Sequence, residues 1–262
     1  MLGVSHATSG AVLGLAVAGY APRLAGIEPS AGTVLTFAAV CAGAALLPDL
    51  DHPSSTATRH FSVASLAAGH VVRPLSALVY RLTRAPRDTG RGTHRGLTHT
   101  VLGAVALGAL VNLASAQWGA PVLLATLFVC IALAIKGLDA IVPGPPSLVI
   151  AAGLTWAVHA GVPGGTAGTA GWLGTAVTLG MVVHSVGDAV TESGAPLFWP
   201  VPIRRRRWYP VGSPRALRFR TGGRVEALFV APALTVATFV LAFLVVPGVA
   251  PLLDRLRELL GV

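Results

Sequence analysis

The stretch EALFVAPALTVATFVLAFLVVP, residues 226–247, decides the class of fold, because Glu226 is its only charged residue. A transmembrane helix needs about 20 mainly apolar residues to cross the bilayer core. Six other windows approach this pattern, namely 8–22, 31–47, 97–116, 121–142, 147–162 and 170–190. Of these, 8–22 and 147–162 are short for a full span. We therefore expect an all-α, polytopic transmembrane helix bundle of about seven spans. It would form a single membrane-embedded domain over residues 1–262.

The overall composition agrees with a membrane protein. Of 262 residues, 53% are hydrophobic and 11% are charged, and the mean hydropathy is +0.72. These values exclude a soluble domain of ordinary composition. Cys41 and Cys130 both lie in apolar runs, far from any Cys-x-x-Cys spacing. Neither a disulfide framework nor a thiolate zinc site is therefore indicated.

Most of the arginines gather in two stretches, and these predict the orientation in the membrane. One stretch runs from Arg81 to Arg95, and the other is a basic loop at 196–224. Positive charge in short loops marks the cytoplasmic side, so we expect a multi-pass membrane protein with both stretches in the cytoplasm. The basic loop carries Trp199 and Trp208 and is expected to lie on anionic membrane lipids. Nucleic acid is disfavoured as a partner, because no binding fold or aromatic platform accompanies the charge.

Two segments are expected to lie along the membrane surface instead of crossing it. Residues 61–83 are largely apolar, yet His70, Arg73 and Pro74 lie near their centre. A central Arg is costly in a spanning helix and Pro kinks it, so we predict an interfacial or re-entrant helix on the cytoplasmic face. Residues 249–262 are predicted to form a short amphipathic tail.

Four polar clusters lie at the ends of the apolar windows. They are Ser5-His6-Ala7-Thr8, the run LPDLDHPSS at 47–55, the run THRGLTH at 93–99 and the run HSVGDAVTESG at 184–194. A single polar residue at a helix end is usually explained by capping or hydration. Four such clusters on one side of the membrane favour a functional site instead. The structural explanation is kept for the residues without this context, which are His60, His70, His159 and Asp139.

Two of the clusters place histidines where their rings can converge on one ion. His184 and Asp188 are four residues apart, so on a helix they share one face and can grip a single metal ion. His94 and His99 straddle the junction between a loop and the window 97–116, where two imidazoles can meet. Thr98 or Ser185 could fix the orientation of these rings.

The remaining ligands come from the run that follows the window 31–47. Asp49 and Asp51 can present two carboxylates on one side of an extended stretch, with His52 beside them. The full set offers nitrogen and oxygen ligands without thiolate. It predicts a divalent metal centre with more than one ion, for which zinc fits and manganese or iron would too.

The runs LPDLDHPSS, HRGLTHT and HSVGDAVTESGAPLFWP resemble the three signature blocks of the YdjM-like family of bacterial inner-membrane proteins, often described as metal-dependent hydrolases. The initial His6-Ala7-Thr8 is similar to the family's N-terminal block, so the resemblance covers the chain up to about residue 200. The family is also considered distantly similar to zinc-dependent phospholipase C and P1-type nucleases. Glu192 matches no expected position and receives no role. The resemblance implies metal or catalytic roles for His6, Asp49, Asp51, His52, His94, His99, His184 and Asp188.

The expected reaction is hydrolysis of a phosphoester, because divalent ions activate water and neutralise charge on ester oxygens. Asp49, Asp51 and Asp188 are the candidate catalytic carboxylates, and any of them could act as the general base. Arg95 could bind a phosphate oxygen, or it could only set topology. A site at headgroup level on the cytoplasmic face favours a lipid or lipid-linked phosphoester as substrate.

Two other functions remain open. A metal-ion or small-solute transporter would use the same residues, although transport sites usually lie near the bilayer midplane on broken helices. A non-catalytic membrane protein with a structural metal would also carry this ligand set.

Overall fold

The computed structural model describes residues 1–20, 23, 26, 28–52, 55, 63–89, 92–138, 146–161, 169–249, 251 and 255. Within these residues every regular element is a helix, and the β pairings are isolated bridges such as that between Thr191 and Phe219. The expected all-α class is therefore confirmed.

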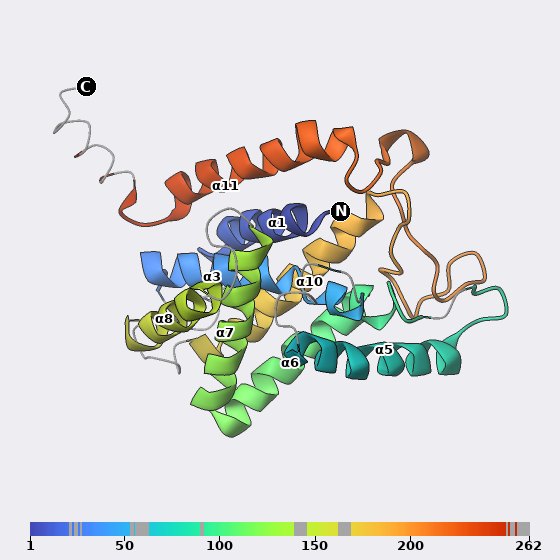
Figure 1. Ribbon diagram of the computed structural model, residues 1–262, viewed down its shortest axis with the longest axis horizontal. Helices are drawn as coiled ribbons and strands as arrows, with labels where there is room; N and C mark the ends of the chain where they lie inside the picture. Colours follow the sequence, from blue (N-terminus) through green and yellow to red (C-terminus); the bar gives the residue numbers. More distant parts are fainter. Residues whose placement is uncertain are drawn as a thin grey trace.

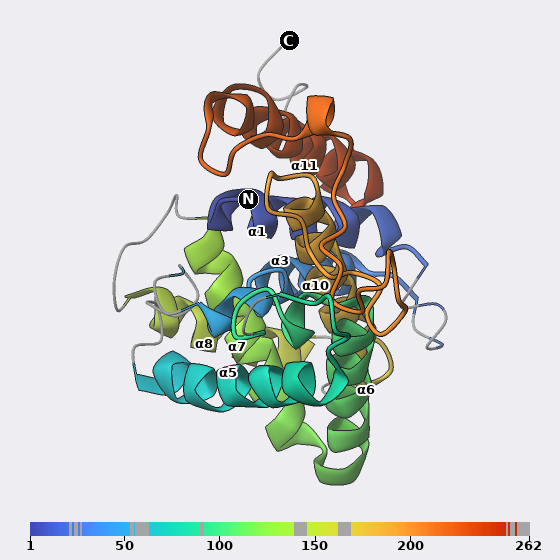
Figure 2. The same cartoon turned by 90° about the vertical axis from the view of Figure 1, so that its right-hand side faces the viewer.

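The α-helices cross one another in a bundle, with α5 at one side and α11 along another (Figures 1 and 2). Short 3₁₀ turns, η1 (Pro48–Asp51), η2 (Leu97–His99) and η3 (Arg215–Leu217), lie between them, and a π-helical turn η4 (Glu226–Val230) leads into α11. The α-helices are α1 (Gly3–Val17), α3 (Ala31–Ala44), α5 (Val63–Thr83), α6 (Val101–Trp118), α7 (Ala120–Gly137), α8 (Pro146–Gly161), α10 (Leu173–Ala189) and α11 (Ala231–Val245).

The predicted count of about seven spans is borne out only in part. Four segments of the described residues are long and apolar enough to cross a membrane, namely Ala31–Asp51, Val101–Trp118, Ala120–Gly137 and Glu226–Val245. The windows 8–22 and 147–162 correspond to shorter apolar helices, Gly3–Val17 and Pro146–Gly161. The window 170–190 forms α10, which has 17 residues. The chain is a helical membrane protein, but seven full spans are not shown.

Two of the helices that are short for a span carry buried polar residues of the candidate site. The first turns of α1 contain Ser5, His6 and Thr8, all buried. The last turns of α10 contain His184 and Asp188, also buried. Helix α1 has 15 residues and α10 has 17, so both are shorter than the four candidate spans.

Helix α3 forms the centre of the bundle, in contact with α1, α7 and α10. A Cβ at Gly10 of α1 would lie 2.5 Å from the Cys41 carbonyl oxygen, and Gly180 of α10 faces the same carbonyl. Gly43 packs in the same way against Cys130 of α7. Such close backbone approach through small residues is typical of helices packed in lipid. Cys41 and Cys130 are free and buried, as expected.

The basic loop 196–224 packs against the C-terminal end of α5 (Figure 1). The hydroxyl of Thr83 accepts hydrogen bonds from the indole nitrogens of Trp199 and Trp208, each at 3.2 Å. The carboxylate of Asp88 accepts from the backbone N–H groups of Arg207 and Trp208. These contacts bring the loop beside the residues that precede α6.

Several predictions concern residues outside the described part of the chain. They include His60, Asp139, Arg91 and almost all of the tail 249–262. Helix α5 matches the segment 61–83 closely and is not among the four candidate spans. Its interfacial position stays a prediction.

Candidate metal centre

The four polar clusters meet where helices begin and end. His6 lies near the start of α1, and Asp49 and Asp51 lie in η1 directly after α3. His99 lies in η2 just before α6, and the pair on α10 lies in its last two turns. Pro48 is the first residue of η1, a position that suits its fixed φ. Each cluster is thus held by the end of a packed helix.

Two imidazole nitrogens and two carboxylate oxygens converge at the centre of the cluster. The Nε2 atoms of His99 and His184 are 3.2 Å apart. Asp49 Oδ1 lies 3.9 Å from His99 Nε2 and 3.7 Å from His184 Nε2. Asp188 Oδ2 lies 3.6 Å and 3.8 Å from the same two nitrogens. Two ligand atoms on a tetrahedral zinc lie about 3.3 Å apart, given Zn–N bonds of about 2.0–2.1 Å. His99, His184 and Asp188 form one of the groups whose donor atoms all lie within 4.8 Å of one another, so these three fit one divalent ion, and Asp49 Oδ1 lies beside both histidines.

The outer nitrogens of the two rings are already engaged. His184 Nδ1 lies 2.7 Å from the carbonyl oxygen of Ala45, to which it must donate a proton. His99 Nδ1 lies 3.0 Å from the Thr98 hydroxyl and 3.5 Å from Asp51 Oδ2. This arrangement leaves both Nε2 lone pairs directed at the same point. Such outer partners are typical of metal-bound histidines.

His99 is neutral in this setting. Its side chain is fully buried, and burial together with the neighbouring His184 places its pKa well below the usual value of 6.5. A neutral imidazole is the form that binds a metal ion.

Asp51 contacts its neighbours by hydrogen bonds. Its Oδ1 lies 2.7 Å from His94 Nδ1, and its Oδ2 accepts from the Thr98 hydroxyl at 3.0 Å. A separation of 2.7 Å is the length of a charge-assisted hydrogen bond and is shorter than the ligand spacing expected around one zinc. Asp51, His94 and His99 are nevertheless one of three groups whose donor atoms lie within 4.8 Å of one another. In the observed geometry Asp51 orients the two imidazoles.

His6 joins the cluster from α1 and is almost fully buried. Its ring stacks on that of His184 with centroids 3.8 Å apart, and its Nε2 lies 3.4 Å from Asp188 Oδ1. With Asp49 and His184 it forms another group of donor atoms within 4.8 Å. Its Nδ1 is buried without a hydrogen-bond partner among the described residues. Gly187 makes room for this ring, because a Cβ there would lie 3.3 Å from His6 Cε1.

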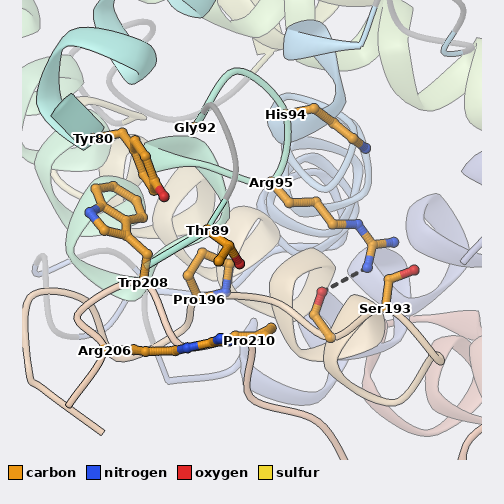
Figure 3. Close-up of a pocket in the computed structure, with 11 residues that line it drawn as sticks. Tyr80, Thr89, Gly92, His94, Arg95, Ser193, Pro196, Arg206, Trp208 and Pro210 are labelled. Carbon is orange, nitrogen blue, oxygen red and sulfur yellow. Dashed lines mark hydrogen bonds between the residues drawn. The ribbon is translucent and has the colours of Figure 1, made fainter. Parts of the chain in front are cut away.

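Arg95 holds Asp188. Its Nη2 lies 3.0 Å from Asp188 Oδ2, and its Nη1 donates to the carbonyl of Gly194 at 2.7 Å, the dashed line in Figure 3. The Arg95 backbone has a φ of 50°, which an L-residue rarely adopts. The sequence suggested a phosphate contact for this arginine and did not reveal the ion pair.

A polar pocket of about 180 Å³ opens beside the cluster (Figure 3). His94 and Arg95 belong to its wall, together with Arg206 and Ser193 from the chain after α10. Tyr80 and Trp208 also line it, with ring centroids 5.3 Å apart. Arg206 was not expected at the site, because it lies in a run of four arginines that topology alone could explain.

The remaining predicted residues lie outside the group of convergent atoms. The ring of His52 lies 4.6 Å from that of His94, but His52 belongs to none of the three donor groups found among the described residues. Ser185 donates to the Met181 carbonyl at 3.0 Å and so does not orient a histidine. His70 is exposed on α5, and His159 packs beside Trp156 on α8. The Ala45 carbonyl, which orients His184, could not be recognised from sequence because any residue type carries it.

The fold and the cluster together define an all-helical membrane protein with buried His and Asp groups that could hold a metal ion. The family model described as YdjM inner membrane protein matches residues 1–250. The chain therefore belongs to the YdjM inner membrane protein family, as the signature blocks indicated. No curated protein and no solved structure matches it. The distant similarity to zinc-dependent phospholipase C and P1-type nucleases is not shown by these comparisons.

Proposed function

We propose that this protein is a membrane-embedded, metal-dependent hydrolase that cleaves a phosphoester bond of a lipid or lipid-linked substrate at the cytoplasmic face of the inner membrane. The observation that carries the proposal is the convergence of donor atoms of His99, His184 and Asp188 at spacings of 3.2–3.8 Å, with Asp49 Oδ1 within 3.9 Å of both histidine nitrogens. A divalent metal there, most simply zinc, would activate water and neutralise charge on the ester oxygens.

His94 is suited to give a proton to the leaving oxygen. Its Nδ1 is held by the buried carboxylate of Asp51 at 2.7 Å, while its side chain remains 40% exposed. It also lines the polar pocket, where a substrate would be accessible to it. A histidine oriented by a buried carboxylate is a recurrent general acid and base. We assign this role to His94 in place of metal ligation.

Arg95 and Arg206 are suited to bind the phosphate. Two N–H groups of Arg95 hold Asp188 and Gly194, and a guanidinium has five N–H donors in total. The remaining donors are available at the pocket that both arginines line. Arg95 would thus position Asp188 and contact a phosphate oxygen at the same time.

The position of the cluster favours hydrolysis over transport. Its residues lie at or just beyond the ends of α1, α3, α6 and α10. Transport sites are typically built in the middle of interrupted helices, near the bilayer midplane. Residues 101–118 of α6 and 31–44 of α3 instead run without interruption away from the cluster.

The first test is the metal content of detergent-purified protein, measured by elemental analysis. We expect the wild type to hold at least one divalent transition metal, and His184→Ala and Asp49→Ala to lose it. His70→Ala is the matched control, because His70 is an exposed histidine outside the cluster. The metal-loaded protein should then release phosphate from phosphatidic acid in mixed micelles, and a chelator should stop the release.

Two results would overturn the proposal. Folded wild-type protein that neither retains nor rebinds a divalent metal would remove the basis of the reaction. A stoichiometric metal without hydrolysis of lipid or soluble phosphoesters would instead assign the metal a structural role.

A further inference from the structure

An apolar groove lies between α5 and α6. It borders the segment before α6 that carries His94 and Arg95 of the candidate site. Its volume is about 580 Å³, within the range of small-molecule sites. Aliphatic side chains form most of its wall, among them Leu75 and Val79 of α5 and Leu107 and Leu110 of α6. Trp199 of the basic loop closes one part of it.

The polar groups at the groove are already engaged elsewhere. Ser76 donates to the carbonyl of Gly92 at 2.6 Å and accepts from the backbone N–H of Leu97 at 2.9 Å. The Thr98 hydroxyl donates to Asp51, and the indole N–H of Trp199 donates to Thr83. An occupant of the groove therefore meets an apolar surface.

The groove adjoins the metal cluster through a single residue. Thr98 lines the groove, while its hydroxyl lies 3.0 Å from both Asp51 Oδ2 and His99 Nδ1. Three residues earlier, Arg95 lines the polar pocket and holds Asp188. One short segment, 94–98, thus forms part of a polar pocket, part of the cluster and part of an apolar groove.

The outer side of the groove is apolar as well. On α5, Leu75 is 50% exposed, and on α6, Leu102 and Leu110 are 46% and 58% exposed. In a membrane protein, exposed leucines of this kind are suited to contact with lipid chains. A hydrocarbon chain could therefore enter the groove sideways from the bilayer.

We propose that the groove between α5 and α6 binds one hydrocarbon chain of the substrate, so that the substrate is an amphiphilic phosphate ester with its phosphate at His94 and Arg95. This inference rests on the proposed function and specifies its substrate. The arginines of the polar pocket match a phosphate in charge, and the groove matches a chain in polarity. Segment 94–98 joins the two sites, because His94 and Arg95 line the pocket and Leu97 and Thr98 line the groove.

The test uses photolabelling, which does not depend on turnover. The probe is hexadecyl phosphate with a diazirine near the end of its chain, bound to the purified full-length protein in dodecyl maltoside micelles. Peptide mass spectrometry then locates the adducts. We expect them on the groove-lining parts of α5 and α6, and we expect unlabelled hexadecyl phosphate to displace them while hexadecanol does not.

A pair of substitutions on α6 provides the matched comparison. Ala106 lines the groove, whereas Ala116 is also exposed on α6 and does not line it. Ala106→Phe should reduce groove labelling about tenfold, because the ring fills space that the chain needs. Ala116→Phe introduces the same ring on the same helix and should leave labelling unchanged.

The other outcomes overturn the proposal. Displacement by hexadecanol as effective as that by hexadecyl phosphate would mean that the groove holds bulk lipid. Adducts spread over α7 and α11, or cross-links between two copies of the chain, would assign the apolar surface to bilayer or dimer contact. Hydrolysis of p-nitrophenyl phosphate is measured separately. Hydrolysis without groove labelling would refute chain binding in the groove and leave the hydrolase proposal standing. Groove labelling without hydrolysis would refute the hydrolase proposal and leave chain binding standing.

Discussion

Asp51 makes several contacts at the cluster without having to bind the metal. It accepts hydrogen bonds from His94 and Thr98, and it lies 3.5 Å from His99 Nδ1. The sequence predicted Asp51 as a ligand because two carboxylates in the run DLDH can face the same way. Within the 3₁₀ turn of η1 their surroundings differ, because Asp51 is fully buried whereas Asp49 keeps 21% of its side chain exposed. The position of each aspartate within the turn decides its role, and the composition of the run does not reveal that position.

The substitution Asp51→Asn tests this role. Loss of a partner that orients metal-bound histidines typically lowers metal affinity about 10–100-fold. We expect a drop of this size, measured by competition with a chromophoric chelator, with the number of bound ions unchanged. Glu28→Gln makes the same chemical change at a side chain that is 91% exposed and should have no effect. Loss of one equivalent of metal in Asp51→Asn would show that Asp51 is a ligand.

At the scale of elements, apolar windows predicted where most helices lie, but not how many of them cross the membrane. The windows 97–116 and 226–247 correspond well to α6 and to η4 with α11. The window 170–190 also forms a helix, α10. Its last turns do not resemble a purely apolar span, because they contain buried His184 and Asp188 of the site. The ligand blocks were recognisable because acids and histidines are rare beside apolar segments. Their mutual geometry was not, because it depends on how the ends of α3, α6 and α10 pack.

Close packing at α3 yields a prediction about stability. A Cβ at Gly10 would lie 2.5 Å from the Cys41 carbonyl oxygen, so Gly10→Leu forces α1 and α3 apart. Such overpacking costs about 1–3 kcal/mol, and each kcal/mol lowers the melting temperature by about 2–4 °C in a chain of this size. Thermal unfolding in detergent should show that decrease. Gly153→Leu on α8, where a Cβ meets nothing within 4 Å, should not show it.

At the scale of the whole molecule, the basic loop 196–224 and the cluster are expected on the same side of the membrane. The arginines of the loop are largely exposed, and Arg206 lines the pocket beside His94. Orientation by positive charge predicts that this side is cytoplasmic.

The substitution Arg205→Cys tests this orientation. Arg205 is exposed, and both natural cysteines are buried, so background labelling should be low. A membrane-impermeant maleimide should label Arg205→Cys in inside-out vesicles and not in intact spheroplasts. Labelling in spheroplasts would place the loop, and the cluster with it, on the periplasmic side.

Glu226 gives the last helix a fixed point of attachment. Its buried carboxylate accepts from the backbone N–H groups of Leu2 at 2.7 Å and Gly222 at 2.8 Å. Beyond this anchor, the side chains of α11 are exposed or half-buried along the helix. The helix is therefore anchored beside the first turn of α1, and its far end packs on the bundle, where Leu241, Ala242 and Val245 lie against the core and Val246 is buried. Helix α11 is thus fastened at both ends, and the start of α1, which carries His6, is clamped by a carboxylate that lies 224 residues away from Leu2 in the sequence.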